Sequence, residues 1–405
     1  MPARVSIIVP VYNGGRHILS ALATVRAQTF TGWELIVVDD GSTDDTAARL
    51  AQSPPDQRQQ VIHQANAGRS GARNRGLASA QGDIIAFLDV DDTWNSSYLT
   101  QMCAALDQAP GAVAAFCGWQ YSDESDRPLP QVVFLTQRDV SRLDQELIWR
   151  NSIPSSSLVA RRRALLQVGG FDETLDACED WDLWLRLKSQ GTFVAVPRAL
   201  MRYRAHAEST TENVAVMERD RLRVNARFLG ALDEPLADWP ALRRQAVGFT
   251  YFNAALGYFW QKNAALGRGK VRQAVQVWPG LLDQDEFYYE LGCAFQPRGL
   301  RGTATGLDLG ASASLIQDIL SHDRPPSAAR STRAYWGRAC LVLARLARNT
   351  RDWRGSHTYA LRALAYADGR DRLRALRLLA RGAVPRAWVR AIGRWRLPAR
   401  ASGPD

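Results

Sequence analysis

The chain has 405 residues, 46% of them hydrophobic, and a formal net charge of +10 at pH 7. This is the composition of an ordinary globular protein, and the length suffices for two or three domains. The cysteines are widely scattered and have neither the paired spacing of a metal site nor the pattern of a disulfide framework. A disulfide-stabilised scaffold is therefore excluded, and a reducing cytoplasm is the expected location. The five cysteines are Cys103, Cys117, Cys178, Cys293 and Cys340.

Neither a signal peptide nor a membrane-spanning helix is expected from the hydrophobic pattern. The first predicted strand begins at about Val5, which leaves no room for a signal peptide before it. Arg338 and Arg345 interrupt the most hydrophobic late stretch, so that stretch is not expected to cross a bilayer.

Short apolar runs alternate with helical patterns over the first 90 residues. The predicted strands are residues 5–9, 34–38, 61–62 and 84–88, and the predicted helices contain Ile18, Leu22 and Val25 and then Ala47 and Leu50. Alternation of this kind is typical of a parallel sheet whose strands are connected by helices. The sequence therefore predicts an α/β domain with a mainly parallel central sheet.

The fourth predicted strand ends in three carboxylates, Asp89, Asp91 and Asp92. Oxygen ligands of this kind suit Mg²⁺ or Mn²⁺, which proteins usually hold with one or two carboxylates while substrate phosphates complete the shell. An acidic turn after a strand is the alternative, because aspartate is a common turn former.

Polar residues also follow the first two strands, at Pro10-Val11-Tyr12-Asn13 and at Asp39-Asp40. Ligands of parallel sheets bind beyond the carboxyl ends of the strands. We therefore expect these two clusters and the carboxylates after the fourth strand to meet in one crevice.

A second acidic group, Glu179-Asp180-Trp181-Asp182, precedes residues at helical spacing. Acidic residues are favoured in the first turn of any helix, so a helix N-terminus explains this group without any catalytic role.

These motifs together resemble those of family 2 glycosyltransferases over roughly residues 1–210. The resemblance rests on Val-Ser-Ile-Ile-Val-Pro-Val-Tyr-Asn from Val5, Val-Val-Asp-Asp-Gly-Ser-Thr-Asp from Val37, Asn-Ala-Gly-Arg-Ser-Gly-Ala-Arg-Asn from Asn66 and Phe-Leu-Asp-Val-Asp-Asp from Phe87. It continues through Val-Gly-Gly-Phe-Asp-Glu from Val168 and Glu-Asp-Trp-Asp from Glu179 to Tyr-Arg-Ala-His from Tyr203.

The resemblance implies a nucleotide-sugar transferase of the GT-A fold that inverts the anomeric centre in a single displacement. On the donor side, Asp40 would accept a hydrogen bond from the base, Tyr12 would pack on the base, and Pro10 would shape the strand end beneath it. Asn13 would belong to the same nucleotide-sugar site, and Asp89 would approach the ribose.

The same resemblance assigns a Mg²⁺ or Mn²⁺ cofactor to Asp91, in what is called a DXD motif, with His206 completing the coordination. A surface or packing role is the alternative for His206. Arg69 or Arg73 would add a positive charge beside the diphosphate, although a surface arginine near a helix start is an equal alternative.

On the acceptor side, Asp180 matches the position of the general base, and a carboxylate is suited to taking a proton from an attacking hydroxyl. Glu179 would orient the site or the acceptor.

The second half of the chain differs from the first in charge. Residues 1–215 carry 20 Lys and Arg against 25 Asp and Glu, whereas residues 324–405 carry 19 Arg and no Lys against four acids. No aromatic-rich reader or zinc motif accompanies the arginines, so nucleic acid is not an expected partner. Attraction to an anionic membrane surface fits better, with peripheral attachment at the inner face, and a solvated helical surface without a partner is the alternative.

The matched motifs end before Pro235 and Pro240, which places the predicted domains at residues 1–220 for catalysis and 240–405 for a basic helical domain. Mixed small and large apolar residues after 240 predict helices, either as helical-hairpin repeats or as an irregular bundle.

The predicted function is transfer of a sugar, from a UDP-sugar in the first place, to a glycan or lipid-linked acceptor in polysaccharide synthesis. Two alternatives stay open. One is a non-catalytic nucleotide-sugar-binding scaffold that acts through its helical domain, and the other is a nucleotidyltransferase. Protein partners, the donor sugar and the acceptor are not specified by the sequence.

Overall fold

The computed structural model describes residues 3–133, 146–206, 213–296 and 299–381. The chain forms two compact units, one of residues 1–278 with 296–301 and the other of residues 279–295 with 302–405. The predicted domain bounds, 1–220 and 240–405, stay a prediction. In the structure the helices of residues 214–277 belong to the first unit.

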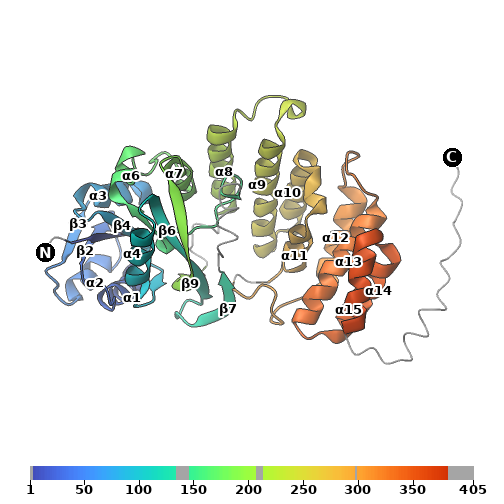
Figure 1. Cartoon of the computed structure of the whole chain (residues 1–405), viewed down its shortest axis with the longest axis horizontal. Helices are drawn as coiled ribbons and strands as arrows, with labels where there is room; N and C mark the ends of the chain where they lie inside the picture. The colour runs from blue at the N-terminus through green and yellow to red at the C-terminus, as the bar shows by residue number, and fades with distance from the viewer. Residues whose placement is uncertain (1–2, 134–145, 207–212, 297–298, 382–405) are drawn as a thin grey trace, which may run out of the picture. The chain divides into compact units, whose positions relative to one another are not determined.

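The first unit opens with the predicted alternation of strands and helices (Figure 1). Its first elements are β1 (Val5–Val11), α1 (Gly15–Arg26), β2 (Trp33–Asp39), α2 (Thr46–Gln52), β3 (Gln59–His63), α3 (Gly68–Ser79) and β4 (Ile84–Phe87). Ile18, Leu22 and Val25 are buried on α1, as their helical spacing predicts. The four predicted strands are therefore confirmed.

The following elements of the first unit complete the sheet and cover it. They are β5 (Thr93–Trp94), α4 (Tyr98–Gln108), β6 (Ala112–Ser122), β7 (Pro128–Val133), β8 (Leu158–Arg161), α6 (Arg162–Gln167), α7 (Glu179–Lys188) and β9 (Thr192–Arg204). A short 3₁₀ turn, η1 (Ser155–Ser157), leads directly into β8.

Within the described residues the sheet has nine strands, in the order β3-β2-β1-β4-β8-β6-β9-β5 with β7 beside β6. The first four strands are parallel, as predicted, whereas β8 is antiparallel to both of its neighbours. The long strands β6 and β9 run parallel and side by side (Figure 1). The sheet is thus mixed, and the parallel prediction holds for the part that the first motifs follow.

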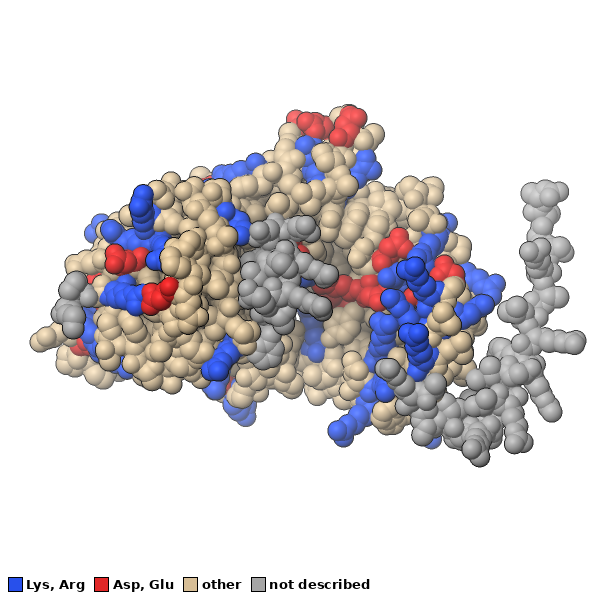
Figure 2. All heavy atoms as spheres, in the orientation of Figure 1, with Lys and Arg blue, Asp and Glu red and all other residues tan. Residues whose placement is uncertain are grey.

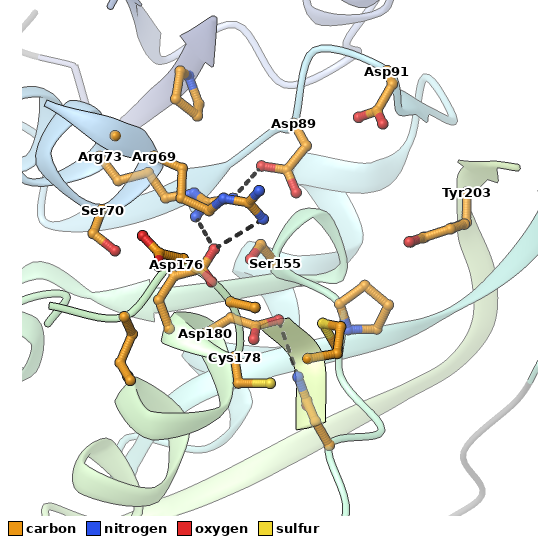
Figure 3. A pocket seen from close by; sticks show the side chains of 18 of the residues that line it. Arg69, Ser70, Arg73, Asp89, Asp91, Ser155, Asp176, Cys178, Asp180 and Tyr203 are labelled. Carbon is orange, nitrogen blue, oxygen red and sulfur yellow. Dashed lines mark hydrogen bonds and ion pairs between the residues drawn. The ribbon is translucent and has the colours of Figure 1, made fainter. Parts of the chain in front are cut away.

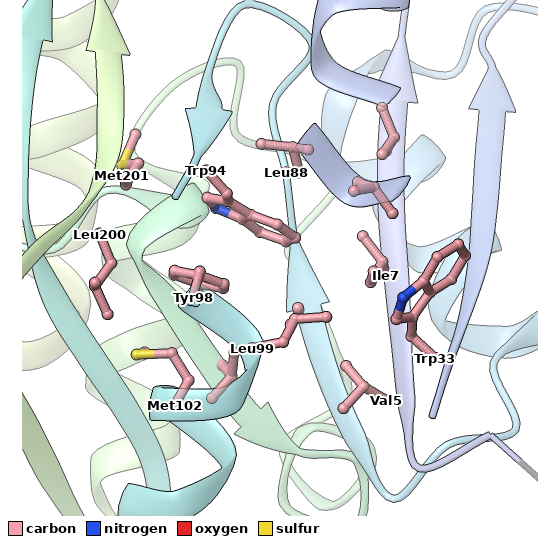
Figure 4. Close-up of a cluster of buried hydrophobic side chains, with 14 of the residues drawn as sticks. Val5, Ile7, Trp33, Leu88, Trp94, Tyr98, Leu99, Met102, Leu200 and Met201 are labelled. Carbon is pink, nitrogen blue, oxygen red and sulfur yellow. The ribbon is translucent and has the colours of Figure 1, made fainter. Parts of the chain in front are cut away.

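Each face of the sheet has its own hydrophobic core. Val5 and Ile7 of β1 pack on one face with Leu99 and Met102 of α4 (Figure 4), while Ile8 faces the other core, which contains Trp184 of α7. Successive residues of a strand point to opposite faces, so an apolar run without polar interruptions is what a sheet covered on both sides requires. Each large apolar side chain buried in this way contributes about 1.5–3 kcal/mol.

Three helices complete the first unit. They are α8 (Val214–Leu229), α9 (Ala241–Trp260) and α10 (Ala264–Val277), and a short 3₁₀ turn, η3 (Leu236–Asp238), precedes α9. A Cβ atom on Gly257 would lie 2.6 Å from Val214 Cγ2, so the absence of a side chain at Gly257 allows α8 and α9 to approach closely. Arg227 of α8 also pairs with Asp182 of α7 at 2.5 Å. These contacts hold α8 and α9 against the sheet domain.

The second unit is helical in its described residues. It contains η4 (Pro279–Asp283), α11 (Asp285–Gly292), α12 (Leu309–His322), α13 (Thr332–Asn349), α14 (Trp353–Tyr366) and α15 (Gly369–Arg381). Consecutive helices pack on each other, α13 on α14 and α14 on α15. Lys and Arg side chains, with acidic ones among them, gather over this unit on the face drawn in Figure 2.

None of the described helices combines the length and the apolar character needed to cross a bilayer.

Candidate functional site

A cavity of about 1160 Å³ opens in the first unit beyond the carboxyl ends of β1, β2 and β4. All of the predicted site residues line it: Pro10, Tyr12, Asn13, Asp40, Arg69, Arg73, Asp89, Asp91, Glu179, Asp180 and His206. Figure 3 shows the acidic and basic members of this set converging from separate elements. The structure therefore brings together residues that lie up to about 200 positions apart in the sequence.

The turn after β1 is held by hydrogen bonds to the loop after β2. Asn13 has a left-handed φ of 51°, and its Oδ1 accepts a hydrogen bond from the backbone N–H of Thr43 at 2.7 Å. Asn13 also donates its own N–H to Ser42 Oγ at 3.0 Å. The side chain of Asn13 thus joins two strand-end loops, and the neighbouring Tyr12 is left 51% exposed at the cavity.

Asp40 occupies the matching position at the end of β2. Its side chain is buried, and Oδ1 accepts hydrogen bonds from Gln64 Nε2 at 2.7 Å and from the backbone N–H of Ala67 at 2.9 Å. These bonds fix the orientation of the carboxylate and join it to the start of α3. Pro10, Tyr12 and Asp40 together form the part of the cavity that the sequence assigns to the nucleotide.

Arg73 links two of the predicted acidic residues in a buried chain of ion pairs. Its guanidinium lies 2.5 Å from Asp89 Oδ1 and 2.6 Å from Glu179 Oε1. Figure 3 shows Arg73 directed toward Asp89. Burial acts to lower the pKa of Arg73, but the charges of Asp89 and Glu179 outweigh it and raise that pKa above its ordinary value. Arg73 is therefore no surface arginine, and that alternative is wrong. Arg69 is partly exposed, 3.7 Å from Glu179.

Asp180 lies at the N-terminus of α7 and is partly exposed to the cavity. Burial and the neighbouring charge of Glu179 raise the pKa of Asp180 to about 7, against the charge of Arg73. Asn151 Nδ2 donates a hydrogen bond to Asp180 Oδ2 at 3.0 Å. The N-cap residue of α7 is Cys178, with a left-handed φ of 60°, and its side chain makes no capping hydrogen bond. Asp180 Oδ1 accepts a hydrogen bond from the first-turn backbone N–H of Trp181 at 2.7 Å, so a helix-start role for this acidic group stays open.

Asp91 and His206 meet at the edge of the cavity. Nε2 of His206 lies 2.9 Å from Asp91 Oδ2, and the ring of His17 lies with its centroid 5.7 Å from that of His206. Burial acts to raise the pKa of Asp91, but the hydrogen bond and charge of His206 outweigh it and lower that pKa. Burial and the charge of Arg204 lower the pKa of His17, which favours a neutral imidazole.

Asp91 offers carboxylate oxygens that suit Mg²⁺ or Mn²⁺, and His206 offers an imidazole nitrogen, which suits Mn²⁺ better than Mg²⁺ when a diphosphate supplies the remaining oxygens. Over the described part of the chain, no group of three or more His, Cys, Asp or Glu side chains is arranged to hold a metal ion by itself. A two-residue set is what a cation held jointly by protein and substrate requires.

Asp92 supports the turn between these acidic groups. Its carboxylate accepts a hydrogen bond from Ser156 Oγ at 2.6 Å, and the same Oγ accepts one from the backbone N–H of Asp89 at 3.0 Å. Burial, followed by the charges of Asp91 and Asp89, raises the pKa of Asp92 well above its ordinary value. Asp92 and Ser156 hold Asp89 and Asp91 in place.

A second wall of the cavity comes from α8 and α9, and sequence reasoning missed it. We call it the helical wall; its residues are Val214, Met217, Glu218 and Arg221 of α8, Thr250, Asn253, Ala254, Gly257 and Trp260 of α9, and Arg301. The spacing of three, four or seven positions puts each set on one face of its helix. We call Tyr12, Asp40, Asp89 and Asp91 the strand-end wall.

The N-terminal segment matches a known family. Residues 6–170 match the family model described as "Glycosyl transferase family 2". This segment is a family 2 glycosyl transferase domain. The predicted family and the predicted fold class, a GT-A α/β domain followed by a helical C-terminal part, are thereby confirmed.

Curated relatives named as glycosyltransferases match part of this chain. An uncharacterized glycosyltransferase of Nostoc sp. is 31% identical over 188 residues, which is 45% of this chain and 56% of that protein. The uncharacterized glycosyltransferase YibD of Escherichia coli is 35% identical over 127 residues, which is 30% of this chain and 36% of that protein. The chain thus spans between about a third and just over half of the length of these two relatives.

Solved structures similar to this chain include S. aureus TarS and a mannosyltransferase. Residues 1–349 of S. aureus TarS, in complex with UDP-GlcNAc, give a TM-score of 0.47 at 20% identity, with 70% of this chain and 83% of that chain covered. The mannosyltransferase PcManGT from Pyrobaculum calidifontis, in complex with GDP-Man and Mn²⁺, gives 0.48 at 18% identity, with 71% and 82% covered.

Proposed function

We propose that this protein transfers a sugar from a nucleotide-sugar donor, a UDP-sugar in the first place, to a hydroxyl of a glycan or lipid-linked acceptor with inversion. The setting would be the synthesis of a polysaccharide or cell-surface glycan. One observation carries the proposal: the strand-end motifs and Asp180 line a single cavity large enough for a donor and part of an acceptor.

The strand-end wall would bind the donor. Tyr12 would stack on the nucleotide base, and Asp40 would accept a hydrogen bond from it, since its carboxylate is already held by Gln64 and Ala67. Asp89 would accept hydrogen bonds from the ribose hydroxyls through the side of its carboxylate that faces the cavity, because Arg73 already neutralises the other side.

Asp91 and His206 would hold a Mg²⁺ or Mn²⁺ ion together with the diphosphate. When bound, such an ion neutralises the charge that develops on the departing nucleotide diphosphate, a contribution of several kcal/mol. Arg69 is partly exposed on the same cavity and would add a further positive charge.

Asp180 would act as the general base. Its carboxyl group would take the proton of the acceptor hydroxyl as that oxygen attacks the anomeric carbon. A pKa of about 7 suits this task, because a base is most effective when its pKa lies near the working pH. Asn151 donates to Oδ2 and the N–H of Trp181 donates to Oδ1, so the carboxylate is oriented before the acceptor binds. Glu179 is paired with Arg73, and this ion pair would fix the position of α7 relative to the donor-binding residues.

A panel of nucleotide sugars, incubated with the protein and Mn²⁺, tests the proposal. We expect slow donor hydrolysis with one donor class, accelerated when an acceptor is added, and release of a nucleoside diphosphate. Release of pyrophosphate would instead indicate a nucleotidyltransferase. Donor binding without any turnover would indicate the scaffold alternative.

We also propose that the second unit binds an anionic membrane surface. Helix α15 exposes Leu373 at 57% and Leu376 at 48%, in a helix that also carries Arg370, Arg372 and Arg377. Apolar side chains flanked by arginines suit the boundary between lipid head groups and acyl chains.

Flotation with liposomes should recover more protein with anionic than with neutral lipid. The double substitution Leu373→Ser with Leu376→Ser should reduce recovery, and equal recovery on both lipids would contradict the proposal.

A further inference from the structure

Helix α8 carries four arginines, and they differ in how their charge is compensated. Arg219 pairs with Asp176 and Asp220, Arg223 pairs with Asp220, and Arg227 pairs with Asp172 and Asp182. Arg221 forms no ion pair and no hydrogen bond with any residue in the described part of the chain, and its Nη1 is buried without a hydrogen-bond partner.

Arg221 lies near the N-terminal turn of α7, the turn that carries the proposed general base. Its guanidinium carbon is 5.8 Å from the centre of the Trp181 ring, and Trp181 directly follows Asp180 on α7. Burial raises the pKa of Cys178 to about 12, and the largest effect opposing that rise is the positive charge of Arg221. Both observations place the unpaired cation next to the N-terminal turn of α7.

The rest of the helical wall does not supply the missing negative charge. Glu218, the acidic residue of that wall, pairs with Lys270 at 2.5 Å. Glu218 is therefore not available to Arg221 as a counter-ion. Arg221 is only partly buried and lines the cavity, so an anion bound there would supply the counter-charge that the described residues do not.

We propose that the helical wall recognises an acceptor that carries an anionic group, and that Arg221 pairs with that group. The shared chemistry is that of a carboxylate or a phosphate, both of which match the planar guanidinium with two parallel hydrogen bonds. This inference rests on the proposed transfer function, because it assigns the acceptor of that same cavity.

Arg221 would determine specificity for the acceptor rather than take part in the chemistry. The strand-end wall already provides residues for the donor, so the charge of Arg221 is not needed for donor binding. Substitution of Arg221 should therefore leave the donor affinity unchanged and weaken the interaction with the acceptor alone.

A glycan array with uronate-bearing, phosphate-bearing and neutral oligosaccharides provides the test. The wild-type protein, loaded with its donor and Mn²⁺, should bind or modify anionic glycans, and the two anionic groups on the array distinguish carboxylate from phosphate. Arg221→Gln should lower the signal on those glycans by about 10- to 100-fold, the effect of losing one charge-assisted hydrogen-bonded pair. Arg221→Lys, which keeps the charge, should retain part of it.

Arg198→Gln is the matched control, because Arg198 is an exposed arginine of β9 that does not line the cavity. It should leave the signal on anionic glycans unchanged. A preference for neutral glycans, no binding to any glycan, or equal signals for wild type and Arg221→Gln would overturn the proposal.

Donor binding, measured separately by thermal shift with nucleotide sugars, keeps the two proposals distinguishable. If the wild-type protein binds no donor, the proposed function fails. If the wild-type protein and Arg221→Gln bind a donor equally well, the result of the glycan array tests the acceptor proposal independently of the proposed function. A weaker donor affinity of Arg221→Gln would place the arginine on the donor and contradict the acceptor assignment.

Discussion

The strand-end wall and the helical wall line the same cavity, but their charged side chains differ in whether they have ion-pair partners. On the strand-end wall, Asp89 is paired with Arg73 and Asp91 with His206. On the helical wall, Arg221 has no ion-pair or hydrogen-bond partner among the described residues. Ion pairs hold the side chains of the strand-end wall in place before any ligand binds. The charge of Arg221, in contrast, gains an ion-pair partner only when an anionic ligand binds. We infer that the first wall serves the donor chemistry common to the family and the second selects the acceptor.

The largest expected effect comes from removing Asp180, the proposed general base. Asp180→Asn keeps the hydrogen bond from Trp181 but cannot accept a proton, so kcat should fall by about 10²- to 10⁴-fold. Product analysis with the best donor and acceptor measures this. Donor affinity should be unchanged in the same variant. A kcat within a few-fold of wild type would remove Asp180 from the role of base.

The pairing on the strand-end wall predicts a large effect on stability. Arg73→Met leaves Asp89 and Glu179 without their shared cation, and breaking a buried pair costs about 3–5 kcal/mol. Thermal unfolding followed by circular dichroism should show a marked fall in Tm.

Arg75→Met provides the control for this stability effect, since Arg75 is exposed on the same helix, two positions away. It should leave Tm nearly unchanged, and so should Arg221→Gln on the helical wall. Equal losses for Arg73→Met and Arg75→Met would mean that the strand-end wall is not held by these pairs.

Substitution of Asp91 should leave binding of the nucleotide base intact and impair the activation of the donor diphosphate. Asp91→Ala should lower kcat by about 100-fold and abolish the stimulation by Mn²⁺, because one of the two proposed metal ligands is lost. A titration of activity with Mn²⁺ after treatment with a chelator checks this. Activity that does not depend on Mn²⁺ in the wild-type protein would contradict the assignment of Asp91 and His206.

The pKa of Asp180 predicts a smaller but specific effect of pH. In the proposed role the ionised form of Asp180 acts as the base. Because the pKa of Asp180 is about 7, kcat/KM should rise about tenfold between roughly pH 6 and pH 8 and then level off. The sign follows from the raised pKa, which keeps the carboxyl protonated and inactive at lower pH. A rate profile measured with saturating Mn²⁺ at each pH tests it, and a flat profile over this range would contradict it.

The sequence by itself determined the strand-end wall. The apolar runs predicted β1 to β4, and the topology of a parallel sheet places Tyr12, Asp40, Asp89 and Asp91 at one edge without any further knowledge. Those positions could be predicted because strand periodicity is local and the carboxyl ends of parallel strands always share an edge. The family resemblance added Asp180 and His206, which local patterns alone would have assigned to a helix start and a surface position.

Only the tertiary structure decided the ion pairs and the second wall. Arg73 lies 106 positions from Glu179, so nothing local in the sequence indicates that the two are bonded. His17, Arg221 and Trp260 belong to no motif and reach the cavity through the packing of their elements. The hydrogen bond from Ser156 to Asp92 also depends on that packing. Helix–helix contacts such as that of Gly257 with Val214 depend on the shapes of side chains distant in sequence. The physical reason is that packing decides which of many similar arginines is left without a partner.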